Sequence, residues 1–233
     1  MNNITDIQNT IYINLNSRPD RRENVEKEMQ QLNLGMPAQR FNAIKLQNGR
    51  IGCSLSHLKC IMMAKENNWT HILIVEDDIR FLNPAAFQQQ LNDFLSSGIE
   101  WDVVLFAGNN IPPYKTCGTH SIQVSKCQTT TGYMVKHHYY DILIANMKAG
   151  LHLLMKEPAN HFHYAIDKYW FQLQMRDKWF LITPLSVVQR EDYSDIEHKT
   201  TNYSRLMLDV DKPHLFKTST IQWKNPIENV YQF

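Results

Sequence analysis

One short segment constrains the fold of this chain more than any other. The apolar run Ile72–Val75 is followed directly by Glu76, Asp77 and Asp78. An apolar run this short, rich in β-branched residues, is typical of a buried central strand. Three consecutive carboxylates cannot lie inside a core, because an uncompensated buried charge is very costly. The sequence therefore predicts a strand whose carboxyl end carries the three acids to an edge of the sheet.

Carboxylates gathered at such an edge are suited to ligand binding. In an open α/β sheet, ligands bind at the carboxyl ends of the strands. Neighbouring carboxylates repel one another unless a cation lies among them, and Mg²⁺ and Mn²⁺ favour oxygen ligands and often bring a diphosphate with them. A solvated acidic turn that caps the next helix accounts for the same residues. The triplet alone leaves both interpretations open.

Apolar patterns along the chain alternate between strand and helix. Strands are expected at residues 11–15, 38–44, 71–75, 101–106, within 122–135, and at 180–183 and 186–189. Helices are expected from the turn at 16–20 to about 34, and at 54–67, 84–97, 139–148 and 163–178, with loops at 49–52 and 108–119. This alternation predicts an α/β fold with a mostly parallel central sheet flanked by helices. A chain of 233 residues suffices for one such domain. We place that domain at residues 1–200, followed by a polar tail at 201–233.

Composition excludes several classes of function. Lys and Arg number 24 against 23 Asp and Glu, so the chain lacks the electrostatic footprint of a nucleic-acid-binding protein. The segment Met1–Asp6 is polar, without the features of a signal peptide, and no apolar run is long enough to span a membrane. We therefore expect a cytoplasmic protein, in solution or at a membrane surface, and its four cysteines as free thiols. The sequence gives no indication of oligomeric state.

Two further segments offer groups that bind anions. Arg18 and Arg21 follow the first strand, and their guanidinium forks suit phosphate or a nucleotide base. Ordinary first-turn charge, neutralised by Asp20 and Glu23, is the alternative. The segment Gly49–His57 places glycines and hydroxyls at a helix start, where free N–H groups bind anions. Taken alone, that segment is better explained by a serine N-cap with a flexible approach.

Taken in order, these segments resemble glycosyltransferase family 25, which includes lipopolysaccharide glycosyltransferases and the collagen galactosyltransferases. The matching pieces are Ile13–Leu15 with Arg18–Arg22, Ile51–His57, and Ile74–Asp78. Less specific similarity appears at 130–135, 166–167, 184–189 and 194–196. The resemblance covers most of residues 9–196. Gly132 stands where the family usually has a larger residue, and the tail after His198 matches no part of the family pattern.

The resemblance implies a GT-A-type, Rossmann-like fold and transfer of a hexose or N-acetylhexosamine from a UDP-sugar. The sugar would move with inversion to a hydroxyl of a glycan or protein acceptor, with Mn²⁺ or Mg²⁺ as cofactor. Such a cation stabilises the charge that develops on the departing diphosphate. By analogy with other glycosyltransferases, Asp78 would bind the metal and His198 would complete its shell. Glu76 and Asp77 would contact hydroxyls of the ribose or the donor sugar.

The same resemblance assigns the remaining site residues. The nucleotide pocket would be lined by Asn14, Arg18 and Arg21, with Gly52, Ser56 and His57 on the neighbouring helix start. Inversion by single displacement needs a base that accepts the proton of the acceptor hydroxyl. Asp167 is the candidate, and Asp195 is held in reserve. A helix N-terminal carboxylate, favoured by the helix dipole, is the alternative explanation of Asp167.

Two other classes of protein stay open. A receiver-like phosphoacceptor domain also places acids at strand ends. Such a domain needs about half of this length and a lysine at a later strand end, and no such lysine stands out. A nucleotide-sugar-binding protein without catalysis would keep Glu76–Asp78 and transfer nothing. In the transferase interpretation, the tail at 201–233 is expected to pack on or near the acceptor site.

Overall fold

The apolar run before the three acids is strand β3 (His71–Glu76), an inner strand of an eight-stranded sheet. The structure is a computed structural model that describes residues 1–215. Across the sheet the strand order is β2-β1-β3-β10-β5-β11-β8-β7. The other members are β1 (Thr10–Asn14), β2 (Gln39–Asn42), β5 (Val103–Leu105), β7 (Tyr114–Thr116), β8 (Ser121–Val124), β10 (Gly132–Lys136) and β11 (Trp179–Ile182).

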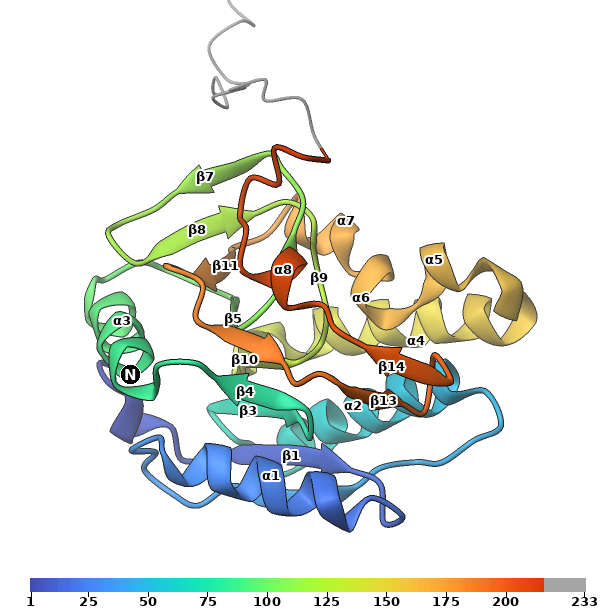
Figure 1. Cartoon of the computed structure of the whole chain (residues 1–233). Helices are drawn as coiled ribbons and strands as arrows, with labels where there is room; N and C mark the ends of the chain where they lie inside the picture. Colours follow the sequence, from blue (N-terminus) through green and yellow to red (C-terminus); the bar gives the residue numbers. More distant parts are fainter. Residues whose placement is uncertain (216–233) are drawn as a thin grey trace, which may run out of the picture.

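Most strands of this sheet run in one direction. Only β10 and β8 are antiparallel to their neighbours, whereas β1, β2, β3, β5, β7 and β11 share a direction. Helices cover both faces (Figure 1). The expected α/β fold, with a mostly parallel central sheet flanked by helices, is confirmed.

Strand β3 divides the core into two layers because its side chains alternate between the two faces of the sheet. Ile72 and Ile74 pack with helices α2 (Gly49–Glu66) and α4 (Tyr140–Lys156). Leu73 and Val75 pack with α1 (Pro19–Gln30) and α3 (Pro84–Ser96) on the opposite face. All four side chains are fully buried, so the run forms the shared centre of both layers.

Smaller elements complete the described chain. Three two-stranded sheets pair β4 (Ile79–Phe81) with β12 (Val187–Gln189), β13 (Asp192–Ser194) with β14 (Lys199–Thr201), and β6 (Asn109–Asn110) with β9 (Cys127–Gln128). The short helices are η1 (Ile4–Asp6), η2 (His137–Tyr139), η3 (Pro158–Asn160), α5 (His161–Tyr164), α6 (Ile166–Tyr169), α7 (Phe171–Gln174) and α8 (Ser204–Met207). No helix among residues 1–215 is both long and apolar enough to cross a bilayer.

Helix α2 begins five residues earlier than predicted, so the loop expected at 49–52 is wrong. The side chain of Asn48 accepts hydrogen bonds from the N–H groups of Arg50 and Ile51 and caps the helix there. Gly52 lies inside the first turns of this helix. Only glycine fits there, because a Cβ at that position would lie 2.4 Å from the carbonyl oxygen of Ile44. The glycines therefore mark a close helix approach instead of a flexible loop.

Two other predicted elements differ from the structure. The helix expected at 163–178 is divided into α5, α6 and α7, because Ala165 adopts an extended conformation between the first two. The loop expected at 108–119 contains β6 and β7, and helix α4 extends to Lys156. Short strands with polar side chains carry little periodicity, which is why the sequence pattern did not reveal them.

Part of the predicted tail packs against two of the small sheets, where α8 contacts β12 and β6. Met207 on α8 is fully buried, and the buried Lys212 donates to the carbonyl oxygens of Asn110 and Asp209. Residues 216–233 of the tail lie outside the described residues. The division at residue 200 and the placement of the tail near an acceptor stay predictions.

The contact at Gly52 leads to a test of stability. Gly52→Ala should lower the free energy of unfolding by about 1–3 kcal/mol, because the new methyl group meets backbone and cannot be accommodated by a rotamer change. Lys59→Ala, on an exposed position of the same helix, should stay within about 0.5 kcal/mol of the wild type. Chemical denaturation of both variants measures the difference. An unchanged Gly52→Ala would show that the segment around Ile44 moves aside freely.

The first residue of β3 leads to a test of pH dependence. His71 is buried, its Nε2 accepts the backbone N–H of Gln8 at 3.1 Å, and burial lowers its pKa. As the pH falls, His71 therefore binds a proton at a higher pH in the unfolded chain than in the folded chain. The contribution of His71 to the free energy of unfolding should therefore be fully present above about pH 6.5, the ordinary histidine pKa. It should decrease as the pH falls through that value toward the lower pKa of the folded state.

The control separates His71 from the other histidines. His71→Gln should reduce the slope of unfolding free energy against pH between about 7.5 and 5.5, whereas His163→Gln, at an exposed position, should leave the slope unchanged. Denaturation at a series of pH values measures both slopes. Identical slopes in the wild type and His71→Gln would exclude the proposed linkage.

Candidate functional site

The ends of β1 and β3 meet where the three acids emerge. The two strands are parallel neighbours, with Ile13 in register with Glu76. Asp77 accepts a hydrogen bond from Asn14 Nδ2 at 2.7 Å and another from Arg21 at 3.0 Å. Burial raises the pKa of Asp77, and Arg21 and Asn14 oppose that rise. Three residues predicted to share one pocket, Asn14, Arg21 and Asp77, are therefore in direct contact.

Glu76 faces the opposite side of this edge, toward helix α2. Its Oε1 accepts the hydroxyl of Thr130 at 3.0 Å and lies 3.3 Å from His57 Nε2 and 3.7 Å from Cys53 Sγ. His57 is fully buried, and its Nδ1 lies 2.9 Å from the hydroxyl of Tyr133. Burial acts to raise the pKa of Glu76, but the contacts with His57 and Thr130 outweigh it and lower that pKa.

Asp78 is the least compensated of the three acids. Its Oδ1 is buried and has no hydrogen-bond partner among residues 1–215, and its Oδ2 lies 3.8 Å from Arg21. Burial, and next the charge of Glu76, raise the pKa of Asp78 well above its ordinary value. An orphaned carboxylate oxygen among other acids has the character of a cation ligand. The residues present therefore fit the divalent metal that the family resemblance implies.

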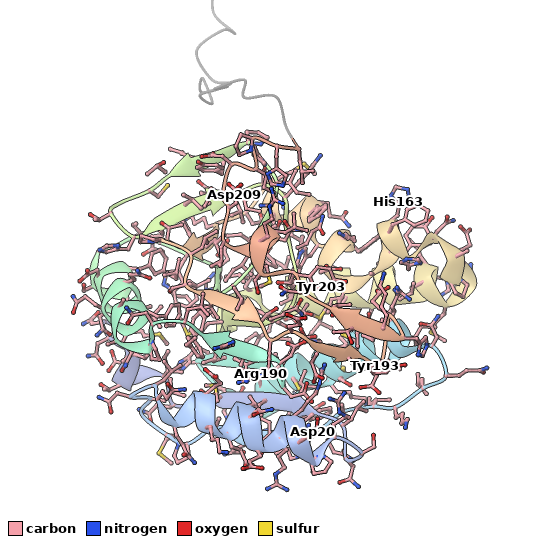
Figure 2. The ribbon with its side chains drawn as sticks, in the orientation of Figure 1. Asp20, His163, Arg190, Tyr193, Tyr203 and Asp209 are labelled. Carbon is pink, nitrogen blue, oxygen red and sulfur yellow. The ribbon has the colours of Figure 1, made fainter. Side chains whose placement is uncertain are left out.

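A hairpin from the end of the chain lies against the same edge. The backbone N–H of Arg190 donates to the carbonyl oxygen of Asp78 at 2.6 Å, and the chain then enters the β13–β14 hairpin. Figure 2 shows Arg190 and Tyr193 on the side of the molecule that also carries Asp20 of α1. Across the hairpin, Arg50 on α2 binds Glu197 at 2.6 Å. The hairpin is thus attached to both α1 and α2.

The hairpin neutralises the charges of Arg18 and Arg21, which follow β1 at the start of α1. Asp192 Oδ2 lies 2.7 Å from Arg18 and 2.9 Å from Arg21, so one carboxylate oxygen bridges both guanidinium groups. Arg18 also binds Asp20 and Asp195, each at 2.8 Å. Both arginine side chains are about 15% exposed or less. Arg18 and Arg21 are therefore held by carboxylates of this chain.

Asp167 reaches the same region from helix α6. Its Oδ2 accepts the backbone N–H of Thr129 at 3.1 Å, which joins α6 to the segment that carries Thr130. Burial raises the pKa of Asp167, Lys168 lowers it, and the charge of Glu76 adds to the rise. A partly buried carboxylate with a raised pKa has the character of a proton acceptor.

The other predicted site residues have structural or peripheral positions. The buried hydroxyl of Ser56 donates to the carbonyl oxygen of Gly52 at 2.8 Å and accepts the N–H of Ile44 at 2.9 Å. Ser56 and Gly52 thus hold α2 to the segment after β2. His198 is exposed in the turn between β13 and β14, and its N–H donates to the Ser194 carbonyl oxygen at 2.8 Å.

Sequence reasoning missed several residues of the site. These are Cys53, Thr130, Tyr133, Arg190 and Asp192. Cys53 and His57 lie four residues apart at the start of the helix predicted from residue 54, and in a helix this spacing places both on one face, so the signal was available. The pairing of Asp192 with Arg18 and Arg21 joins residues at opposite ends of the chain, and no local pattern indicates it.

Comparison with solved structures finds distant similarity. A glycosyltransferase involved in the glycosylation of the major capsid of PBCV-1 is 14% identical, with 87% of this chain and 89% of that chain covered and a TM-score of 0.47. A197 from STIV is 11% identical over 83% and 93%, with a TM-score of 0.46. GlyE of Streptococcus pneumoniae TIGR4 is 8% identical over 77% and 46%, with a TM-score of 0.43. TM-scores below 0.5 place no constraint on function.

Sequence comparison is more specific. A search of curated proteins finds no match to this chain. The model of glycosyltransferase family 25 (LPS biosynthesis protein) matches residues 45–170, more than half of the chain. The matched region contains the Cys53–His57 helix start, the three acids and Asp167, but neither the arginines of the first strand end nor the hairpin. The chain therefore belongs to glycosyltransferase family 25.

Proposed function

We propose that this glycosyltransferase moves a hexose or N-acetylhexosamine from a UDP-sugar to a hydroxyl of a glycan or protein acceptor. Transfer would proceed with inversion on a GT-A-type arrangement of the sheet. The observation that carries the proposal is Asp78, whose buried Oδ1 lacks a partner among the described residues at the end of β3. A carboxylate in this state, next to the arginines of the first strand end, suits a cation that brings a diphosphate.

Asp78 and His198 are the residues that would hold Mn²⁺ or Mg²⁺. When bound, the cation would supply electrostatic stabilisation of the charge that develops on the leaving diphosphate. Asp78 lies at the end of β3, and His198 lies on the hairpin that begins beside it. The hairpin would therefore contribute a ligand to a site that β3 begins.

Asn14, Arg21 and Asp77 would form the wall of the nucleotide pocket. Their hydrogen bonds join the ends of β1 and β3 and the start of α1, so these three side chains would already be oriented when the nucleotide arrives. Glu76 and Asp77 would contact hydroxyls of the ribose or donor sugar through oxygens that remain free or exchange partners. His57, bonded to Glu76, would fix the orientation of that carboxylate, while Gly52 and Ser56 position the helix that carries it.

Arg18 and Arg21 would bind the diphosphate after it replaces Asp192. The carboxylate oxygen of Asp192 bridges both guanidinium groups in the way a phosphate oxygen would. Donor binding would then release the hairpin from α1.

Asp167 would accept the proton of the acceptor hydroxyl. As that proton moves to the carboxylate, the hydroxyl oxygen forms a bond to the anomeric carbon, and the bond from this carbon to the diphosphate breaks. UDP leaves with the electron pair of the broken bond. Burial raises the pKa of Asp167, which favours proton uptake. Asp195 is the alternative base, although its ion pair with Arg18 must open first.

A donor screen tests the transferase. Hydrolysis of UDP-galactose, UDP-glucose and UDP-N-acetylglucosamine should be measured with and without Mn²⁺, and one of them should be turned over only with metal. Asp78→Asn should reduce that turnover by about 10²–10³-fold, the usual loss for one electrostatic contact to a developing charge. Asp93→Asn, on α3, where the carboxylate pairs with His120 at 3.2 Å outside the site, serves as the matched control and should keep full turnover.

The screen separates the alternatives. Donor binding without turnover would favour a catalytically inactive nucleotide-sugar-binding protein. Absence of binding by every donor would exclude the proposed function. Full metal-dependent turnover by Asp78→Asn would show that another residue binds the cation.

A second variant tests competition at the arginines. Asp192→Asn removes the negative charge that bridges Arg18 and Arg21, so UDP should bind roughly three- to tenfold more tightly, as expected when a charged hydrogen bond no longer competes. Asp20→Asn removes a partner of Arg18 outside the hairpin and should change affinity less. Titration calorimetry with UDP measures both. Weaker binding by Asp192→Asn would show that this carboxylate orients the arginines for the nucleotide.

A further inference from the structure

Three side chains with metal-binding atoms meet beneath the acidic edge. Cys53 and His57 project from one face of α2, four residues apart, and Glu76 ends β3. One ligand atom from each, the thiol sulfur, an imidazole nitrogen and a carboxylate oxygen, lies within 4.8 Å of the other two. Asp78 does not belong to this group. The cluster is therefore a separate feature of the site, and its chemistry differs from that of the oxygen-rich edge.

Two of the three separations match the edges of a metal tetrahedron, and the third lies within 4.8 Å. In a tetrahedral zinc site, bonds of about 2.05 Å to nitrogen and oxygen and about 2.3 Å to sulfur place the nitrogen and oxygen about 3.4 Å apart, and the sulfur and oxygen about 3.6 Å apart. Here His57 Nε2 lies 3.3 Å and Cys53 Sγ lies 3.7 Å from Glu76 Oε1.

Hydrogen bonding is the alternative explanation of the same separations. An N–H···O bond usually spans about 2.7–3.2 Å, so the 3.3 Å between His57 and Glu76 is long. A buried thiol is a weak donor. The separation between His57 and Glu76 is thus slightly longer than a well-formed N–H···O bond, whereas the 3.7 Å between Cys53 and Glu76 fits either a weak S–H···O bond or two ligands of one ion.

The surrounding residues supply the outer contacts that a metal-binding histidine needs. Histidine ligands usually donate their second ring N–H to a fixed partner, which orients the ring. His57 Nδ1 lies 2.9 Å from the hydroxyl of Tyr133, and both side chains are fully buried with their rings stacked. Glu76 is held in turn by the hydroxyl of Thr130 at 3.0 Å. Ring and carboxylate are therefore both oriented before any ion binds.

We infer that Cys53, His57 and Glu76 form a second metal site, for a borderline divalent ion such as Zn²⁺. A thiolate, an imidazole and one carboxylate suit Zn²⁺ better than Mg²⁺ or Mn²⁺, which prefer oxygen. Three protein ligands leave a fourth position for water or a substrate oxygen, as in catalytic zinc sites. The inference goes beyond the proposed function and does not depend on it.

Ion binding at this site releases a proton. The thiol of Cys53 loses its proton to solvent as the sulfur–metal bond forms, so one proton leaves for each ion bound. Affinity should accordingly fall as the pH is lowered.

Cobalt provides a spectroscopic probe that is independent of catalysis. The metal-free protein titrated with Co²⁺ should develop a thiolate-to-cobalt charge-transfer band that saturates at one equivalent bound to this site and that one equivalent of Zn²⁺ abolishes. Cys53→Ser should lose the band. Tyr133→Phe, which removes the outer contact of His57, should weaken Zn²⁺ binding by about 10–100-fold. Far-ultraviolet circular dichroism of each variant checks that it folds.

Two control variants identify the source of any signal. Asp78→Asn should keep the band, because Asp78 belongs to the proposed Mn²⁺ site, and Cys117→Ser should keep it because that thiol lies outside the cluster. Absence of the band in the wild type would overturn the inference and leave a hydrogen-bonded cluster. A band that survives in folded Cys53→Ser, or disappears in Cys117→Ser, would do the same. A missing Mn²⁺ effect on donor turnover would bear only on the proposed function.

Discussion

The repulsion among three adjacent carboxylates is the constraint on which this site depends. Each acid meets it differently. Asp77 is compensated by Arg21 and Asn14, and Glu76 by His57 and Thr130. Asp78 receives only the distant charge of Arg21 and keeps one buried oxygen without a partner among the described residues. Compensation of the negative charge therefore decreases from Glu76 to Asp78. A cation would be stabilised most at Asp78, the last of the three acids in the sequence.

These compensating groups come from separate elements, which explains why the fold converges here. Asn14 ends β1, Arg21 lies on α1, His57 on α2, and Thr130 just before β10. The parallel order of β1 and β3 brings Asn14 and Arg21 to the acids, and antiparallel β10 brings Thr130 from the other side. A change that moved any one of these elements would therefore leave a carboxylate without its compensating partner. The local packing and the electrostatics thus depend on each other.

Sequence patterns predicted the parts of this arrangement that depend on local periodicity. Strand β3, its central position and the acids at its end follow from a short apolar run and the cost of burying charge. The contact of Asn14 and Arg21 with Asp77 was foreseeable because neighbouring parallel strands end at one edge. The hairpin was not foreseeable, since β13 and β14 are three residues each and mostly polar. The start of α2 was misplaced because the capping strength of Asn48 outweighed the apparent flexibility of two glycines.

The attachment of the hairpin at both ends has a consequence for any ligand of the arginines. Before the hairpin, β12 pairs with β4, and after it Met207 is fully buried, with its sulfur 3.4 Å from the N–H of Gln189. A segment held at two ends cannot diffuse away when Asp192 leaves Arg18 and Arg21. Its effective concentration at the arginines stays fixed, on the order of millimolar or more for a short tether. A diphosphate that bound these arginines would therefore compete with a carboxylate of the same chain, and dilution of the protein would not weaken that competition.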